Sequence, residues 1–318
     1  MDAKQNIDND FLKAIARLCY VDCIPQRIVA EMFNISQAKV SRLLNLARER
    51  GIVRIEVSDY NPRCVDVENE LKKRFGLQDV IVLKTVDFAN TEKMIRQVGY
   101  FGSEQIARYL LPNMTVGISG GRTLMYVVDE LQKKKTLERL TVVQLMGNVG
   151  AKPYKFDSSE LGRKLSANNS VFLALNTPIF VRDKMLKKKL LAHKQLKSVM
   201  KLYSQIDVAL VGIGTLESSI FTTSGVITKQ EFAELRQNGA VGEICGHFFD
   251  REGRECKSIL KDCVISIELK VLRKIPKIFA VVCSGEKRDA ILGAIRGRFI
   301  NSLLIDDMEA RKLLECKL

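Results

Sequence analysis

Seven short apolar segments recur along the chain, and most are separated by stretches with helical spacing. They cover residues 80–83, 115–118, 140–145, 171–175, 208–211, 278–282 and 302–305. Strands that alternate with helices are typical of an α/β domain with a largely parallel sheet. This pattern predicts the α/β class for most of the chain. At 318 residues the chain is long for one ordinary domain, so we expect one small and one large domain.

The pattern of residues 1–57 predicts three helices. The first has apolar residues at helical spacing, namely Phe11, Leu12, Ile15 and Leu18. Pro25 suits the first turn of the second helix, whose expected apolar face is formed by Ile28, Val29 and Met32. Asn34 accepts a left-handed backbone between the helices, and Ser36 is the expected N-cap of a third helix that Gly51 closes.

The spacing of Ala30, Asn34 and Val40 is typical of a helix-turn-helix, in which a small residue, a tight turn and an apolar anchor follow one another. The third helix would present side chains to the major groove, where Arg, Lys and Gln read bases and Ser holds phosphate. The expected DNA-binding residues are Gln37, Ala38, Lys39, Ser41 and Arg42. Residues 52–57 alternate like a strand and are expected to form a wing. The alternative is a helical interaction domain that never contacts DNA.

Charge and domain boundaries add to this interpretation. Residues 1–57 have a net charge of only +2, which favours an oligomer on repeated half-sites. A polar hinge and a linker helix at 65–75 follow, so we expect a DNA-binding domain at 1–57, a linker at 58–75 and an effector-binding and oligomerisation domain at 76–318. The basic run 182–201 is either a solvated helical face or a surface for a phosphate or a partner.

The segment "VGISGGRTL" places a glycine turn between an expected strand and an expected helix. Gly120 and Gly121 let an anion approach backbone N–H groups at the positive end of the helix. Arg122 adds a bidentate contact and Thr123 a hydroxyl. The same letters also fit a simple tight turn, because the spacing is neither that of a P-loop nor that of a dinucleotide fingerprint.

Other functions find less support in the composition. The eight cysteines form no CxxC pair and only two histidines accompany them, so we expect reduced thiols, no metal and no cofactor. No apolar run approaches the ~20 residues that span a bilayer, and the polar N-terminal segment does not resemble a secretory signal, so we expect a cytoplasmic protein without membrane contact.

The sequence resembles the SorC family of sugar-responsive bacterial transcriptional regulators from about residue 11 onward. The motifs that carry the resemblance are "SQAKVSRLLNLARERGIVRIEV", "VGISGGRTL", "VGIGT", "GAVGEICGHFFDREG" and "NSLLIDDMEARKLL", in the family's order. The resemblance implies a helix-turn-helix joined to a sensor domain similar to sugar-phosphate isomerases and glucosamine-phosphate deaminases. It also implies operator DNA and a phosphorylated sugar as partners, and a homo-oligomer, either a dimer or a tetramer.

The resemblance assigns ligand roles to particular residues. Ser119, Gly120, Gly121, Arg122 and Thr123 correspond to the phosphate loop, Glu243 to an acidic residue that binds sugar hydroxyls, and Lys287 to a ligand-side lysine. Two departures affect the assignment: Cys283 and Ser284 stand where relatives have Gly-Gly, and Met146 replaces a basic residue that faces the ligand in some members.

Purely structural roles are the alternatives to these assignments. Glu243 also fits a surface strand edge, Lys287 a helix start, Asp250 a turn former and His247 a packed histidine. The rival function is a sugar-phosphate isomerase or deaminase with an appended helix-turn-helix. Such chemistry needs a positioned general base, and only Glu243 and Lys287 are available near the loop, so we expect no enzyme activity.

Overall fold

The structure is a computed structural model that describes residues 7–56, 60–85, 90–150, 154–283 and 285–316. Contacts divide the chain into two compact units, Met1–Asn61 and Pro62–Leu318. The division falls close to the expected end of the first domain. Each unit is described by itself.

The smaller unit consists of three helices, α1 (Asn9–Tyr20), α2 (Gln26–Met32) and α3 (Gln37–Glu49). Its core is formed by residues from all three, mainly Leu12, Ile15, Val29, Val40 and Leu44. The expected apolar face of α2 is wrong in part. Ile28 and Met32 are 38% and 60% exposed, because this two-turn helix buries Val29 and Ala30 instead.

The larger unit is built on a seven-stranded sheet in the order β1-β10-β9-β5-β2-β3-β4, and every pairing is parallel. The strands are β1 (Asp79–Leu83), β2 (Thr115–Ile118), β3 (Thr141–Gln144), β4 (Val171–Leu173), β5 (Val208–Gly212), β9 (Lys277–Val281) and β10 (Ser302–Asp306). The predicted α/β fold with a largely parallel sheet is therefore confirmed, and each of its strands lies on one of the apolar segments.

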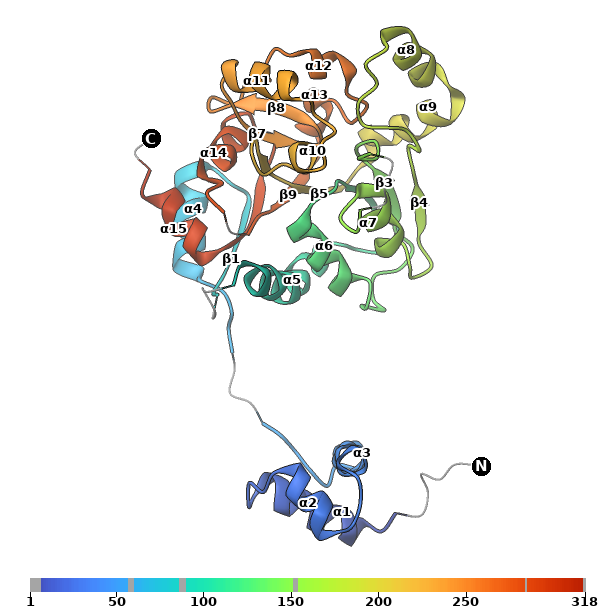
Figure 1. The fold of residues 1–318 in the computed structure, drawn as a ribbon, viewed down its shortest axis with the longest axis vertical. Coiled ribbons are helices and arrows are strands. Elements are labelled where there is room, and N and C mark those ends of the chain that lie inside the picture. Colours follow the sequence, from blue (N-terminus) through green and yellow to red (C-terminus); the bar gives the residue numbers. More distant parts are fainter. Residues whose placement is uncertain (1–6, 57–59, 86–89, 151–153, 284, 317–318) are drawn as a thin grey trace. The chain divides into compact units, whose positions relative to one another are not determined.

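Both faces of this sheet are covered, as parallel sheets require. One face packs on α5 (Thr91–Ala107), α6 (Arg122–Leu131) and α7 (Ser158–Leu165). The other packs on α4 (Val65–Phe75), α9 (Lys194–Lys201), the short helix η1 (Leu202–Gln205), α13 (Leu269–Leu272), α14 (Arg288–Arg296) and α15 (Asp307–Leu314). On β1, Ile81 and Leu83 face the first layer and Val80 and Val82 the second, so side chains alternate between two cores. Figure 1 shows the layers around the sheet.

A second, three-stranded antiparallel sheet was not expected. It contains β6 (Gly214–Thr215), β7 (Ala240–Ile244) and β8 (His247–Asp250). Cys245 and Gly246, at φ 52° and 82°, form the two-residue turn between β7 and β8. The sequence signal was weak because a cysteine occupies a position that usually holds Asn, Asp or Gly. Helices α10 (Ile220–Thr223), α11 (Lys229–Gln237) and α12 (Ile259–Cys263) lie near this sheet, and α8 (Lys184–Ala192) packs against α9 and α12.

Helix α4, expected as a linker, belongs to the core of the larger unit, where Val67 and Leu71 are buried. Its Glu68 is 2% exposed and joins the helix to the sheet. The Glu68 carboxylate accepts two hydrogen bonds from the Arg63 guanidinium, at 2.9 and 2.5 Å, and one from Val82 N–H at 2.9 Å. This carboxylate therefore satisfies a buried backbone donor as well as a cation.

We expect Glu68→Ala to lower the free energy of unfolding by about 2 kcal/mol, because it removes the acceptor of Val82 N–H and two hydrogen bonds with the Arg63 guanidinium. The partial exposure of Arg63 keeps the cost moderate, since water can solvate it. Urea unfolding followed by circular dichroism measures the change. Glu70→Ala, an exposed position on the same helix, is the matched control; equal losses in both variants would contradict this role for Glu68.

Candidate functional site

The turn between α2 and α3 has the geometry that the sequence predicted. Asn34 is left-handed at φ 49°, and Ile35 N–H donates to Ala30 C=O at 2.9 Å. The Ser36 hydroxyl accepts from Lys39 N–H at 3.2 Å and so caps α3. Val40 is fully buried and anchors α3 on the other two helices.

The five residues predicted to contact DNA all lie exposed on the first two turns of α3: Gln37, Ala38, Lys39, Ser41 and Arg42. The first turn of α3 contains no acidic residue. Arg42 makes one weak contact, from Nε to Ala38 C=O at 3.4 Å. This end of α3 therefore presents two cations and two neutral polar groups to solvent, a set that can bind phosphate and base edges.

The predicted wing is wrong within the described residues. Residues 52–56 form turn and irregular structure without a strand, and residue 57 lies outside the described part of the chain. Ile52 and Val53 pack on the helices, and their N–H groups both bond to Ala47 C=O at the end of α3. Because these groups finish the helix, they are not available to start a strand ladder.

A cavity of about 620 Å³ lies at the carboxyl ends of β2, β5 and β9. The chain leaves β2 for α6 on one face of the sheet, and leaves β5 for the antiparallel sheet on the other face. Neighbouring strands whose connections diverge in this way leave a crevice between them, the usual ligand position in α/β sheets. The glycine loop predicted to bind an anion forms one wall of this crevice.

The glycine loop packs tightly against the end of β5. A Cβ on Gly120 would lie 2.9 Å from Phe156 C=O, and one on Gly212 would lie 3.0 Å from Gly120 C=O. The Ser119 hydroxyl accepts from Gly212 N–H at 3.1 Å. Gly120, Gly121, Arg122 and Thr123 line the cavity, whereas Ser119 lies behind them and holds the two strand ends together.

The amino end of α6 supplies unused donors. Gly121 N–H donates to Phe156 C=O at 2.9 Å, so it is not available to a ligand. The next three amides, of Arg122, Thr123 and Leu124, have no acceptor within the described residues, as expected for the first turn of a helix. All three residues line the cavity. Together with the helix dipole, these amides could bind an anion.

Glu243 faces this loop from β7. It is 7% exposed, and burial raises its pKa to about 7, although the Gly246 N–H bond and Lys287 oppose that shift. Its carboxylate accepts from Gly246 N–H at 3.3 Å. A Cβ on Gly214 would come within 2.5 Å of Oε1, so glycine at this position makes room for the acid. The surface-edge interpretation of Glu243 is therefore wrong.

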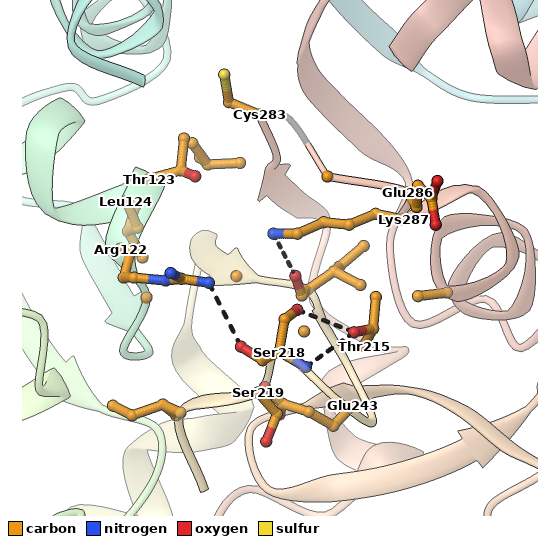
Figure 2. Close-up of a pocket in the computed structure, with 18 of the residues that line it drawn as sticks. Arg122, Thr123, Leu124, Thr215, Ser218, Ser219, Glu243, Cys283, Glu286 and Lys287 are labelled. Atoms are coloured by element: carbon orange, nitrogen blue, oxygen red, sulfur yellow. Dashed lines mark hydrogen bonds between the residues drawn. The ribbon is translucent and has the colours of Figure 1, made fainter. Parts of the chain in front are cut away.

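Lys287 both begins a helix and lines the cavity. It is the N-cap of α14, and its ammonium group donates to Ile213 C=O at 3.1 Å. Burial and, next, the charge of Arg122 lower its pKa. Figure 2 shows the side chains of Arg122 and Lys287 reaching from opposite walls toward the middle of the cavity. Two cations, Arg122 and Lys287, thus line the same cavity as Glu243 and the α6 amides.

The loop of residues 214–219 completes the cavity and was not predicted as part of the site. Ser218 C=O accepts from Arg122 Nη2 at 3.4 Å, and the Thr215 hydroxyl lies 2.9 Å from the Ser218 hydroxyl. Both hydroxyls come from residues that line the cavity. The motif "VGIGT" was the available signal, because its glycines mark close backbone approach after a strand.

Of the other residues named from the sequence, only Cys283 lines the cavity within the described part of the chain. Met146 is 2% exposed in the core and does not line the cavity, whereas Cys283 does line it; Ser284 is outside the described residues. His247 is a packed histidine whose Nδ1 lies 2.6 Å from Glu255 Oε1. Asp250 forms a turn, since its carboxylate accepts from Glu252 N–H and Arg254 N–H.

No group of three or more His, Cys, Asp or Glu side chains among the described residues is placed to hold a metal ion. None of the helices in the same residues is long and apolar enough to cross a membrane.

Comparison with known proteins supplies relatives over nearly the full length. The sequence profile of the family "Putative sugar-binding domain" matches residues 60–315. The deoxyribonucleoside regulator of Bacillus subtilis is 29% identical over 305 residues, which cover 94% of this chain and 95% of that protein. The transcriptional regulator LsrR of Enterobacter sp. is 27% identical over 311 residues, covering 96% and 93%.

A solved structure agrees with the sequence comparison. The crystal structure of the full-length sorbitol operon regulator SorC from Klebsiella pneumoniae is similar with a TM-score of 0.76 and 27% identity. The match covers 98% of this chain and 100% of that one. The likeness therefore extends beyond the larger unit.

The raised pKa of Glu243 predicts a pH-dependent stability. The folded state holds the proton more tightly than the unfolded chain, whose carboxyl has its ordinary value of 4.5. The contribution of Glu243 to the free energy of unfolding is then highest below that value and falls by about 3 kcal/mol as the pH rises through 7. Glu243→Gln stays neutral, so we expect it to lack this fall.

Urea titrations at pH 5 and pH 8 test the expectation. Exposed Glu104 on α5 provides the control Glu104→Gln, which should keep the fall of the parent protein. An unchanged pH dependence in Glu243→Gln would mean that Glu243 is charged throughout.

Proposed function

This chain belongs to the sugar-binding domain family of SorC-type transcriptional regulators, and we propose that a phosphorylated sugar in the larger unit controls its affinity for operator DNA. The observation that carries this proposal is the convergence of the α6 amides, Arg122, Lys287 and Glu243 on one cavity. Phosphate needs the cations and amides, and sugar hydroxyls need an acceptor such as Glu243. The cavity contains both kinds of group, since Arg122, Lys287 and Glu243 all line it.

The smaller unit is the DNA-binding part of this proposal. Helices α2 and α3, with Ala30 near their crossing and Asn34 in the turn, form a helix-turn-helix in which α3 enters the major groove. Arg42 and Lys39 suit guanine or phosphate, and Gln37 suits adenine. The small net charge of this unit limits the affinity of one copy. We therefore propose a homo-oligomer, a dimer or tetramer, on repeated half-sites.

The larger unit is the sensor, with an architecture like that of sugar-phosphate isomerases. Of the loop amides first expected to bind phosphate, Gly121 N–H already has an acceptor. The phosphate therefore rests on the amides of Gly120, Arg122 and Thr123 and on the Arg122 guanidinium, with Lys287 opposite. The sugar hydroxyls point toward Glu243. A protein of this kind works in the cytoplasm, where operator DNA and sugar phosphates are both present.

An enzyme is the second candidate, and one observation favours it. A carboxyl with a pKa near 7 beside a lysine with a lowered pKa is a pair that isomerases use for proton transfer. The names of the relatives favour regulation instead. Incubation of purified protein with candidate sugar phosphates distinguishes the two functions. Steady turnover of a sugar phosphate would show that the protein is an enzyme.

Control of DNA binding requires that the sugar prefer one state of the oligomer. A ligand with equal affinity for both states shifts nothing. The coupling is reciprocal, so operator DNA changes sugar affinity by the same factor, typically ~5–150-fold.

We expect the triple variant of Gln37, Lys39 and Arg42 to alanine to lose operator binding, because it removes the base-reading and phosphate-binding groups of α3. If Arg42 reads a base, Arg42→Ala alone should weaken operator binding by about 1–3 kcal/mol and relax the sequence preference at one base pair. If Arg42 holds phosphate, the variant should weaken binding to all DNA sequences alike. Fluorescence anisotropy with labelled duplexes measures both. Arg48→Ala, at the far end of α3, should bind nearly as the parent does. Unchanged affinity in the triple variant would rule out this interface.

We expect Arg122→Ala to lose the response to the sugar while keeping sugar-free operator binding, because the loop belongs to the larger unit and not to α3. A thermal-shift screen of phosphorylated sugars first identifies a ligand, which raises the melting temperature by mass action. Anisotropy with and without that ligand then compares parent and variant. Arg163→Ala, exposed on α7 and outside the cavity, should respond as the parent does. A normal response in Arg122→Ala would leave the loop a structural role only.

A further inference from the structure

A second cavity lies at the opposite end of the parallel sheet. It has a volume of about 650 Å³ and is bordered by the residues that lead into β1, β9 and β10, at their amino ends. Its lining contains four arginines, Arg74, Arg273, Arg296 and Arg298, and no acidic residue. The function proposed above makes no use of this cavity.

The positive charge of this cavity is largely unneutralised. Arg74 donates to the carbonyls of Leu314 and Cys316, and Arg273 lies 4.8 Å from the centre of the Phe299 ring. Arg296 has an acidic neighbour among the described residues, Glu252, at 3.6 Å. No carboxylate of the described residues forms an ion pair with Arg74, Arg273 or Arg298. Guanidinium groups around one concavity raise the local concentration of anions.

The floor of the cavity is apolar. Leu77, Ile278, Leu292 and Ile300 are each at most 7% exposed and contribute to the lining. Gln78 and Asn301 add amides at the rim. A concave site of this volume with an apolar floor and a few converging charged groups has the form of a small-molecule site rather than of a flat macromolecular surface.

We propose that this cavity is a second ligand site, which binds a small molecule carrying two or more phosphate groups. Planar guanidinium groups bind phosphate bidentately, and arginine is the side chain that suits this geometry best. The site is separate from the sugar cavity, although β9 and α14 reach both. Val281 and Ala290 line the first cavity, and Ile278 and Leu292 line the second.

Isothermal titration of the full-length protein with inorganic tripolyphosphate, at fixed ionic strength, tests this proposal. We expect the Arg273→Gln/Arg298→Gln double variant to bind tripolyphosphate about tenfold more weakly or worse, because each lost guanidinium removes charged hydrogen bonds. Arg163→Gln is the control for loss of charge alone and should bind as the parent does. Arg122→Ala, which removes a phosphate contact of the first cavity, should weaken only tripolyphosphate binding at that cavity and keep the binding that the Arg273→Gln/Arg298→Gln variant loses.

The outcomes separate this proposal from the regulatory one. Both arginines are exposed, so the fold should survive; melting temperatures without tripolyphosphate check this, and Arg298→Gln alone serves if the double variant is unstable. Unchanged tripolyphosphate binding in the arginine variants, or equal loss in Arg163→Gln, would overturn the proposal. If only Arg122→Ala lost tripolyphosphate binding, the anion would bind in the first cavity and the proposal of a second site would be wrong. Weaker operator binding with unchanged tripolyphosphate binding would assign the arginines to DNA backbone instead.

Discussion

The close approach of the ends of β2 and β5 is the constraint on which the rest of the larger unit depends. A Cβ on Gly212 would lie 3.0 Å from Gly120 C=O, one on Gly120 would lie 2.9 Å from Phe156 C=O, and the Ser119 hydroxyl ties the two strand ends together. This contact sets the start of α6 beside the loop that follows β5. Without it, the free amides of α6 would not face Glu243 across one cavity. The glycines therefore specify a distance, in addition to the flexibility usually ascribed to them.

Charge within the cavity follows from that spacing. Burial makes the charged forms of Glu243 and Lys287 less stable than they are in water, and the charge of Arg122 adds to this effect on Lys287. A bound dianion with hydroxyl groups would relieve the repulsion between the cations and give the acid a donor. Two cations and a buried acid that line one cavity are typical of a binding site rather than of a packed core.

Much of the fold follows from the sequence by simple physics. Strands buried on both faces are rich in apolar residues, so the inner strands of the parallel sheet stood out, and the half-exposed edge strand β4 was still recognisable as an apolar segment. The hairpin of β7 and β8 did not, because its turn uses Cys245 at a positive φ and its polar residues Glu243 and His247 point into the protein. Local patterns cannot show that a carboxylate finds room beside Gly214. They also could not show that Ile52 and Val53 would finish α3 rather than start a strand.

The order of the strands has a consequence for how the chain is made. β1 is among the first parts of the larger unit to leave the ribosome, yet its parallel partner is β10, near the end of the chain. Until β10 is synthesised, the backbone N–H and C=O groups of β1 lack this partner strand, and the apolar side chains of β1 lack that neighbour. The three-helix unit, whose contacts are local, can fold at once. We therefore expect the nascent protein to carry a finished helical unit attached to an open sheet, a state in which chaperones would bind the sheet and spare the helices.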